Sequence, residues 1–341
     1  MSAPASIAGH RRQRPRRLRR VAALGGGTGL PAVLRGMRDR LALDDRSALT
    51  AVVTMTDDGG SSGRLRRTLG ALPPGDVRRC LVALSEEESL MAGLFEHRYG
   101  GTAGVGGHTV GNLILTALAE QTGSFLKAVE ASADVLRIRG RILPSTQDNV
   151  QLEAILDDGC RLLGETGIAR TDRTIRRIRL RPGSAKPSPG VIESIRNADL
   201  VVLGPGSLFT SVIPNIVVDG VAEALRDTAA VVVLAANLVG EKGEAAGLEL
   251  RDHLRVIEEH IGTPAVDAVL VHEGAIAVDV LERYRDEGSI PLGWSGPEPP
   301  GVRVIRRNLI AAGPKLRHDP VSTAAGLVAA WRSVNVEVAR P

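Results

Sequence analysis

Aromatic residues are scarce in this chain of 341 residues and make up 2% of it. Proteins that bind single-stranded nucleic acid usually stack bases on aromatic rings, so this composition argues against that class. Long apolar runs are also lacking, and none approaches the roughly 20 residues that a membrane-spanning helix needs. With 43% hydrophobic and 24% charged residues, the sequence has an ordinary globular composition, and we expect no membrane span.

Cysteine is nearly absent as well. The two cysteines, Cys80 and Cys160, lie far apart, match no zinc-binding spacing and provide no disulfide framework. This usage fits a reducing compartment, so we expect a cytoplasmic protein.

A basic segment at the N-terminus carries much of the net charge of +4. It reads HRRQRPRRLRR and precedes the first apolar segment, and without it the charges roughly balance. A terminal run of this kind is usually a solvated arm rather than a nucleic-acid site. We therefore expect residues 1–18 to form a disordered tail, and we do not expect nucleic acid as a partner.

The rest of the chain alternates short apolar runs with helical patterns. RVAAL is followed by the helical PAVLRGMRDRL and by ALTAVVTMT, and the same alternation resumes with DLVVL, AAVVVLAAN and AVDAVLVHE. This order is typical of βαβ units, and fully apolar strands suit a parallel sheet covered on both faces. The predicted fold is therefore α/β: a Rossmann-like, doubly wound, mostly parallel sheet.

An antiparallel β insertion is expected to interrupt this body. The segments RGRILPST, NVQLEAILDDGCRLLGE and TIRRIRLRP lie between the two α/β halves, and Asp158-Gly159 joins two apolar runs as a hairpin turn does. We place the insertion at about residues 137–182, within a single domain that spans residues 19–341.

A glycine-rich loop follows the first predicted strand. Gly26, Gly27, Thr28 and Gly29 lead into a helix that should begin near Pro31, a favoured first helical residue. Glycines allow close approach of the backbone, and a helix start presents unpaired N–H groups, so a phosphate is the natural ligand.

The second predicted strand ends in two adjacent carboxylates, Asp57 and Asp58, followed by Ser61, Ser62 and Arg64. Ligands of open α/β sheets bind at this end of the strands. Either carboxylate can hold a Mg²⁺ ion that bridges phosphates, or accept a bond from a ribose hydroxyl. Neighbouring side chains on extended backbone point in opposite directions, so we expect one of the two to face the ligand.

A further glycine loop, Gly204-Pro205-Gly206-Ser207, follows the strand DLVVL and leads into a helix that carries Ser211. Two such loops on neighbouring strands can enclose a diphosphate more completely than one. Between the loops in the sequence lie His108 and Asn112, which share one helical face if the helix begins early enough. They are candidates for contacts to a base, a sugar or a metal-bound water, or alternatively for structural roles.

Two residues of the C-terminal third are also binding candidates. Tyr284 lies in a helical pattern and offers an aromatic face for a uracil, and Arg317 can reach a phosphate or the polar edge of a sugar. The alternative for Tyr284 is a place at the edge of the core.

Taken in order, the segments GGGTGL, TMTDDGGSSGRLR, LPPGDVRRCLVAL, GHTVGNLIL and LGPGSLFTSVIPNIVV resemble the motifs of the CofD/YvcK family, from about Val21 to about Glu273. DDGGSSGRLR followed by LPPGDVRR is similar to the YvcK branch, whose members are called putative gluconeogenesis factors. The resemblance implies a regulatory protein that binds UDP-sugars and supports cell shape on gluconeogenic carbon sources. It assigns nucleotide contacts to Gly26, Gly27, Thr28, Gly29, Asp57, Asp58, His108, Asn112, Gly204, Gly206 and Ser207.

Two other functions stay open at this point. The CofD branch transfers a phospholactyl group from a guanosine diphosphate carrier to a deazaflavin, so the resemblance also allows a transferase that uses a GDP-linked donor. A Rossmann-like sheet with an acid after the second strand suits NAD as well. The catalytic residues, the sugar, the metal and any homo-oligomer remain undefined by the sequence.

Overall fold

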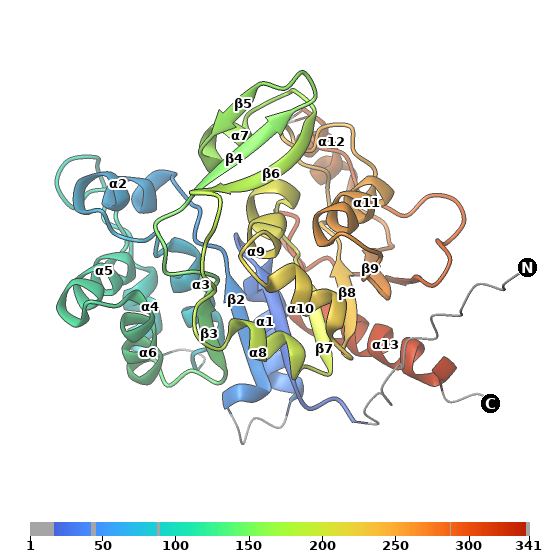
Figure 1. Ribbon diagram of the computed structural model, residues 1–341, viewed down its shortest axis with the longest axis horizontal. Helices are drawn as coiled ribbons and strands as arrows, with labels where there is room; N and C mark the ends of the chain where they lie inside the picture. The colour runs from blue at the N-terminus through green and yellow to red at the C-terminus, as the bar shows by residue number, and fades with distance from the viewer. Residues whose placement is uncertain (1–16, 42–45, 87–88, 287, 339–341) are drawn as a thin grey trace, which may run out of the picture.

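The computed structural model describes residues 17–41, 46–86, 89–286 and 288–338. Its main sheet has seven strands in the order β10-β9-β8-β7-β1-β2-β3, and all six pairings are parallel (Figure 1). The strands are β1 (Val21–Gly25), β2 (Leu49–Val53), β3 (Arg141–Pro144), β7 (Leu200–Leu203), β8 (Val231–Ala235), β9 (Ala268–His272) and β10 (Arg303–Arg307). The chain winds one way from β1 to β3 and the other way from β7 to β10, which confirms the doubly wound α/β prediction.

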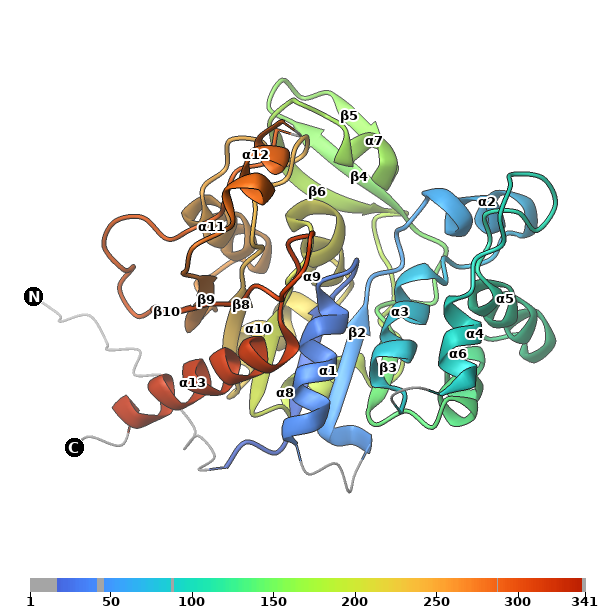
Figure 2. The same ribbon diagram turned by 180° about the vertical axis from the view of Figure 1, so that it is seen from behind.

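Helices cover both faces of this sheet. One face carries α1, α3 and α13, with α4 to α6 beside them, and Figure 2 shows α1 and α13 side by side on it. The other face carries α8 to α11. The helices are α1 (Leu30–Arg40), α2 (Gly60–Leu69), α3 (Gly75–Leu84), α4 (Leu90–Glu96), α5 (Val110–Thr122), α6 (Phe125–Val135), α7 (Glu165–Ala169), α8 (Val191–Arg196), α9 (Ile213–Ile216), α10 (Val221–Asp227), α11 (Leu250–Ile261), α12 (Val278–Asp286) and α13 (Pro320–Val338), with a 3₁₀ turn at Arg46–Ala48 and a π turn at Leu208–Val212.

The central strand β1 shows why its sequence is apolar throughout. Ala22 and Leu24 belong to the hydrophobic cluster on the α8–α11 face, whereas Val21 and Ala23 belong to the cluster beneath α1 and α13. Because successive side chains of a strand point to opposite faces, a strand covered on both sides needs apolar residues at every position. All five residues of β1 are buried.

The antiparallel insertion is present. It consists of β4 (Gln151–Leu156), β5 (Arg161–Leu163) and β6 (Ile175–Arg181), in the order β5-β4-β6, and Figure 1 shows it beyond the carboxyl ends of the main strands. Asp158 and Gly159 lie in the turn between β4 and β5, with Gly159 at a φ of 83°.

The predicted start of the insertion, near residue 137, lies too early, because the predicted range includes one strand of the main sheet. Residues 141–144 form β3, which pairs in parallel with β2. The segment RILP is short and ends in proline, so its own residues give no sign of which sheet it joins. The antiparallel strands themselves begin at Gln151.

Residues 1–16 of the expected basic tail lie outside the described residues. Among the described residues, no single helix has the length and apolar composition to cross a membrane, and Leu208–Ile216 with Val221–Asp227 meets that test only as a pair bent by 77°.

Candidate functional site

The loops that follow β1 and β7 lie against each other. We call residues 25–29 the first glycine loop and residues 204–207 the second glycine loop. β1 and β7 are neighbours in the sheet, at the point where the strand order changes direction. A Cβ atom on Gly29 would stand 2.6 Å from the backbone oxygen of Pro205, so the two loops approach as closely as glycine allows. Ligands of doubly wound sheets bind in the crevice at such a switch point.

The first glycine loop is held by α3. Gly27, at a φ of 65°, donates its N–H to Oδ2 of Asp76 at 2.7 Å, and its carbonyl oxygen accepts from Nε of Arg79 at 3.1 Å. Asp76 and Arg79 also form an ion pair with each other. Both belong to the GDVRR segment of the family motif, yet neither was assigned a role from the sequence, because a contact to a loop 49 residues away leaves no local pattern.

The start of α1 leaves part of this loop uncovered. The helix begins at Leu30, with Gly29 as its N-cap and Pro31 in its first turn, as the sequence predicted. No side chain caps it, and Thr28 is exposed. Among the described residues, the N–H groups of Thr28 and Gly29 donate no hydrogen bond to the protein. These donors are free for an anion.

The second glycine loop is held by side chains from beyond β8. The amide of Asn237 donates to the carbonyl of Gly206 at 3.1 Å and accepts from its N–H at 2.9 Å. Ser207 donates its hydroxyl hydrogen to Glu241 at 2.7 Å. Ser211 is buried, and its hydroxyl lies 3.7 Å from the place of a Cβ on Gly27, so it stands between the two loops.

The two adjacent carboxylates after β2 have different partners. Asp57 accepts from the N–H of Gly59 at 2.9 Å and faces the start of α3, whereas Oδ1 of Asp58 accepts from both the N–H and the hydroxyl of Thr166, at 2.9 and 2.6 Å. Burial, with the charge of Asp76, raises the pKa of Asp57. Asp57 therefore lies near the first glycine loop, and Asp58 anchors the insertion.

The remaining candidates after β2 form a separate buried cluster. The hydroxyl of Ser61 lies 2.9 Å from Nδ1 of His108 and accepts from the amide of Asn112 at 2.9 Å. The helix α5 begins at Val110, so His108 precedes it rather than sharing a face with Asn112. Burial and the charge of Arg64 lower the pKa of His108. In the described residues, the hydrogen bonds of these side chains join α2 to α5 and do not reach the glycine loops.

Two further candidates also make structural contacts. The hydroxyl of Ser62 accepts from the N–H of Gly75 at 3.2 Å, at the start of α3. The guanidinium of Arg64 donates to the carbonyls of Thr102 and Gly106, at 3.3 and 2.7 Å, and so holds the segment before His108 in place.

Three buried glutamates that sequence reasoning missed also lie in this region. Glu165 accepts from the hydroxyl of Thr56 at 3.2 Å, and burial together with the charges of Asp57 and Asp76 raises its pKa well above the usual range. Behind Ser207, burial raises the pKa values of Glu241 and Glu244, and the charge of Glu241 acts on Glu244 as well.

Five carboxylates thus border the glycine loops: Asp57, Asp76, Glu165, Glu241 and Glu244. Their positions depend on tertiary folding, since they come from four separate segments. No three His, Cys, Asp or Glu side chains within the described ranges are arranged to hold a metal ion by themselves.

Tyr284 and Arg317 are brought close to each other. The hydroxyl of Tyr284 accepts from the N–H of Leu316 at 3.2 Å, so α12 holds the segment that carries Arg317, whose side chain is exposed. Nε2 of His318 lies 3.0 Å from the carbonyl of Ala236, next to Asn237. The backbone around Arg317 therefore runs alongside the support of the second glycine loop.

Comparisons with known proteins place this geometry in a family. The model of the family described as 2-phospho-L-lactate transferase CofD matches residues 21–310. A protein of Halalkalibacterium halodurans named gluconeogenesis factor is 42% identical over 272 residues, which cover 80% of this chain and 83% of the relative. A Bacillus subtilis protein of the same name is 38% identical over 312 residues, 91% of this chain and 97% of the relative.

A solved structure agrees with the fold. The crystal structure of a Bacillus halodurans protein of the UPF0052 family superposes with a TM-score of 0.84 at 38% identity, and covers 91% of this chain and 99% of that one. The chain therefore belongs to the CofD family and, within it, groups with the bacterial proteins named gluconeogenesis factor.

Proposed function

We propose that this protein binds a UDP-sugar, with the diphosphate between the two glycine loops. The observation that carries the proposal is the contact of the loops at the switch point, where Gly29 meets Pro205 and the N–H groups of Thr28 and Gly29 are free. Backbone donors at a helix start are a common phosphate site, and two adjacent loops suit two phosphates.

A divalent cation is part of the same proposal. Those of the five carboxyl groups that are ionised would repel a diphosphate, and a Mg²⁺ ion offsets this charge. Asp57 and Asp76 are the ligands that we propose. Asp58 is turned toward Thr166 in the insertion, whereas Asp57 lies close enough to Asp76 that burial and the charge of Asp76 both raise its pKa. Mg²⁺ usually takes one or two protein carboxylates and completes its shell with phosphate and water, so a third protein ligand is not required.

The base and the sugar extend, in this proposal, toward the β8–β10 side of the second glycine loop. Tyr284 and the segment of Arg317 lie together there, linked through Leu316. An aromatic face supports stacking of a uracil, and an exposed guanidinium suits the polar groups of the sugar or a phosphate. His108, Asn112 and Ser61 then stabilise the surrounding helices rather than contact the ligand.

The biological role that we propose is regulation rather than catalysis. The relatives that match most of this chain are named gluconeogenesis factor, and the resemblance connects that branch with cell shape on gluconeogenic carbon sources. In this role the protein would act in the cytoplasm as a sensor of a nucleotide sugar.

Isothermal titration calorimetry of the full chain tests the binding proposal. The panel is UDP-glucose, UDP-N-acetylglucosamine, UDP, GDP and NAD⁺, each with Mg²⁺ and with EDTA. We expect a UDP-sugar to bind more tightly than GDP and NAD⁺, and more tightly with Mg²⁺ than with EDTA. Tighter binding of NAD⁺, or no binding of any UDP-sugar, would reject the proposal.

A second candidate is transfer of a phospholactyl group, which the description of the matching family model favours. The same carboxylates and Mg²⁺ would then hold the diphosphate of a GDP-linked donor. Incubation with a deazaflavin acceptor and a donor in which lactate is linked to the diphosphate of GDP tests it. The acceptor hydroxyl displaces GMP at the phosphate that carries the lactate, so GMP and the phospholactyl-deazaflavin product are the readouts. Absence of product under conditions where a UDP-sugar binds would leave the regulatory role.

A further inference from the structure

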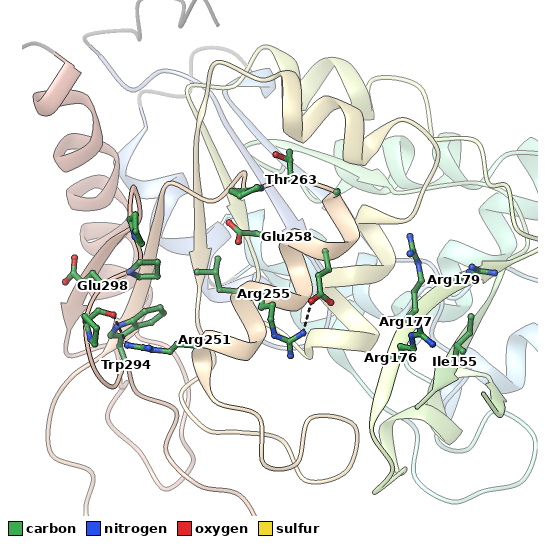
Figure 3. A pocket seen from close by; sticks show the side chains of 17 residues that line it. Ile155, Arg176, Arg177, Arg179, Arg251, Arg255, Glu258, Thr263, Trp294 and Glu298 are labelled. Atoms are coloured by element: carbon green, nitrogen blue, oxygen red, sulfur yellow. Dashed lines mark hydrogen bonds and ion pairs between the residues drawn. The ribbon is translucent and has the colours of Figure 1, made fainter. Parts of the chain in front are cut away.

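A groove of about 1110 Å³ lies between β6, α11 and the segment of residues 294–300 (Figure 3). None of its lining residues belongs to the glycine loops or to the carboxylates beside them. Five of its lining residues are arginines: Arg176, Arg177 and Arg179 from β6, and Arg251 and Arg255 from α11. We call it the arginine groove.

Two of the three carboxylates of the arginine groove already have ion-pair partners. Glu259 pairs with Arg255 at 2.8 Å, and Glu298 pairs with Arg306, outside the groove, at 3.0 Å. The third, Glu258, has a buried Oε1 without a hydrogen-bond partner among the described residues, and burial raises the pKa of its carboxyl group. Two of the three carboxylates are thus paired with other arginines, and burial disfavours the ionised form of Glu258.

The arginines of β6 are cations of this groove that have no ion pair in the described part of the chain. Arg176, Arg177 and Arg179 are exposed, and within the described ranges none has an ion-pair partner. The alternation along β6 buries Ile178 and Leu180 and leaves Arg177 and Arg179 on the open face. A row of cations beside a groove favours an occupant with several negative charges.

Trp294 adds an unused hydrogen-bond donor. Its indole Nε1 is buried and has no acceptor among the described residues. The ring lies 5.4 Å from the guanidinium carbon of Arg251, whose Nη2 donates to the carbonyl of Pro297 at 2.7 Å. A buried donor without an acceptor costs free energy, so an oxygen of an occupant would stabilise this position. Tryptophan and arginine are also the residues that contribute most often to protein interfaces.

We propose that the arginine groove docks an acidic segment of a partner protein. Its carboxylates pair with the arginines of β6, and a backbone or carboxylate oxygen accepts from Trp294. The volume slightly exceeds the roughly 300–1000 Å³ of small-molecule pockets, and the groove is open, which suits an extended peptide. One half-buried tryptophan, already stacked by Arg251, offers no row of rings for successive bases, which favours a peptide over nucleic acid.

Fluorescence anisotropy of the full chain with a labelled peptide of about ten glutamates tests the proposal, at about 50 mM salt so that screening is limited. The test variant is Arg177→Glu with Arg179→Glu. The matched control is Arg283→Glu with Arg285→Glu, which makes the same change of charge on exposed residues of α12. Arg177→Gln with Arg179→Gln repeats the test without charge reversal, and the melting temperature of each variant checks that it folds.

We expect the test variant to bind the peptide about tenfold more weakly or worse, because two attractive pairs become repulsive, and the control to stay close to the parent. Trp294→Phe should weaken binding by a smaller factor, since the ring remains and the donor is lost. Three results would overturn the proposal: no binding of the peptide to the parent, equal losses in test and control variants, or tighter binding of an RNA oligonucleotide of equal charge that the test variant loses.

Discussion

Replacing Asp57 and Asp58 one at a time by asparagine is expected to change different properties of the protein. Asp58 accepts two hydrogen bonds from Thr166, and neutral acceptors hold such bonds less strongly than charged ones. Because the amide oxygen of Asp58→Asn can still accept, we expect a loss of stability of about 1 kcal/mol. For a chain of this length that corresponds to a fall in melting temperature of about 1–2 °C. Binding of a UDP-sugar should change little.

Asp57→Asn is expected to have the opposite profile. The asparagine can still accept from Gly59. It also removes the two causes that raise the pKa of Asp57, the burial of its charge and the repulsion from Asp76, so the ligand-free protein should be as stable as the parent or more stable. Loss of a Mg²⁺ ligand should weaken UDP-sugar binding about tenfold or more, which is about 1.4 kcal/mol. In EDTA, Asp57→Asn should instead bind the UDP-sugar more tightly than the parent does, because one less negative charge faces the diphosphate.

Calorimetry with and without Mg²⁺, together with thermal melts, measures both variants. Equal losses in Mg²⁺ and in EDTA would mean that Asp57 contacts the ligand directly, and the cation argument would fail. Small and equal effects of the two replacements would mean that both aspartates only form a turn and have no role in ligand binding.

Three further changes test other parts of the site. Gly29→Ala should lower the melting temperature and abolish UDP-sugar binding, because its Cβ would stand 2.6 Å from a backbone oxygen, whereas Gly93→Ala, with nothing near its Cβ, should do neither. Glu244→Gln should stabilise the ligand-free protein more at about pH 8 than at about pH 5. Burial raises the pKa of Glu244 in the folded parent, so the parent loses stability as the pH rises from the unfolded pKa toward the folded pKa, and the glutamine variant does not. Denaturant melts at both pH values check this, with the exposed Glu282→Gln as control, and a pH-independent difference would contradict it. Tyr284→Phe should cost about 1 kcal/mol of stability, because the hydrogen bond to Leu316 is lost, but keep UDP-sugar binding. Tyr284→Ala should weaken UDP-sugar binding by about 1–3 kcal/mol without affecting the binding of pyrophosphate. If calorimetry finds equal losses for both ligands, the ring lies outside the base site.

The sequence was sufficient for the sheet because the local pattern and the tertiary environment agree. A strand such as β1 is apolar at every position only if both of its faces are covered, and the glycine loops after β1 and β7 follow from the same pattern. β3 was misplaced because four residues ending in proline carry no sign of their neighbour in the sheet. The start of α5 lies at Val110 because Thr109 caps it, which moved His108 out of the helix.

The site could be predicted only in its backbone part. The glycine loops can be recognised from the sequence because the positive φ of Gly27 and the close approach of Gly29 to Pro205 require glycine at these positions. The acidic residues of the site could not be recognised in this way. Asp76 lies on α3 and Glu165 on the insertion, and both segments reach the first glycine loop only through tertiary folding. No spacing rule connects them to Asp57.

The insertion is tied to the candidate site through two consecutive residues of α7. Thr166 holds Asp58 by two hydrogen bonds, while Glu165, next to it, carries a pKa raised by burial and by Asp57 and Asp76. The contact of Thr166 with Asp58 is attractive and independent of a ligand. The interaction of Glu165 with Asp57 and Asp76 is repulsive until a cation or a proton removes charge. Because both act on α7, a cation at Asp57 and Asp76 would stabilise the packing of the insertion as well as the diphosphate. The strand β6, which carries the arginine groove, belongs to this same insertion.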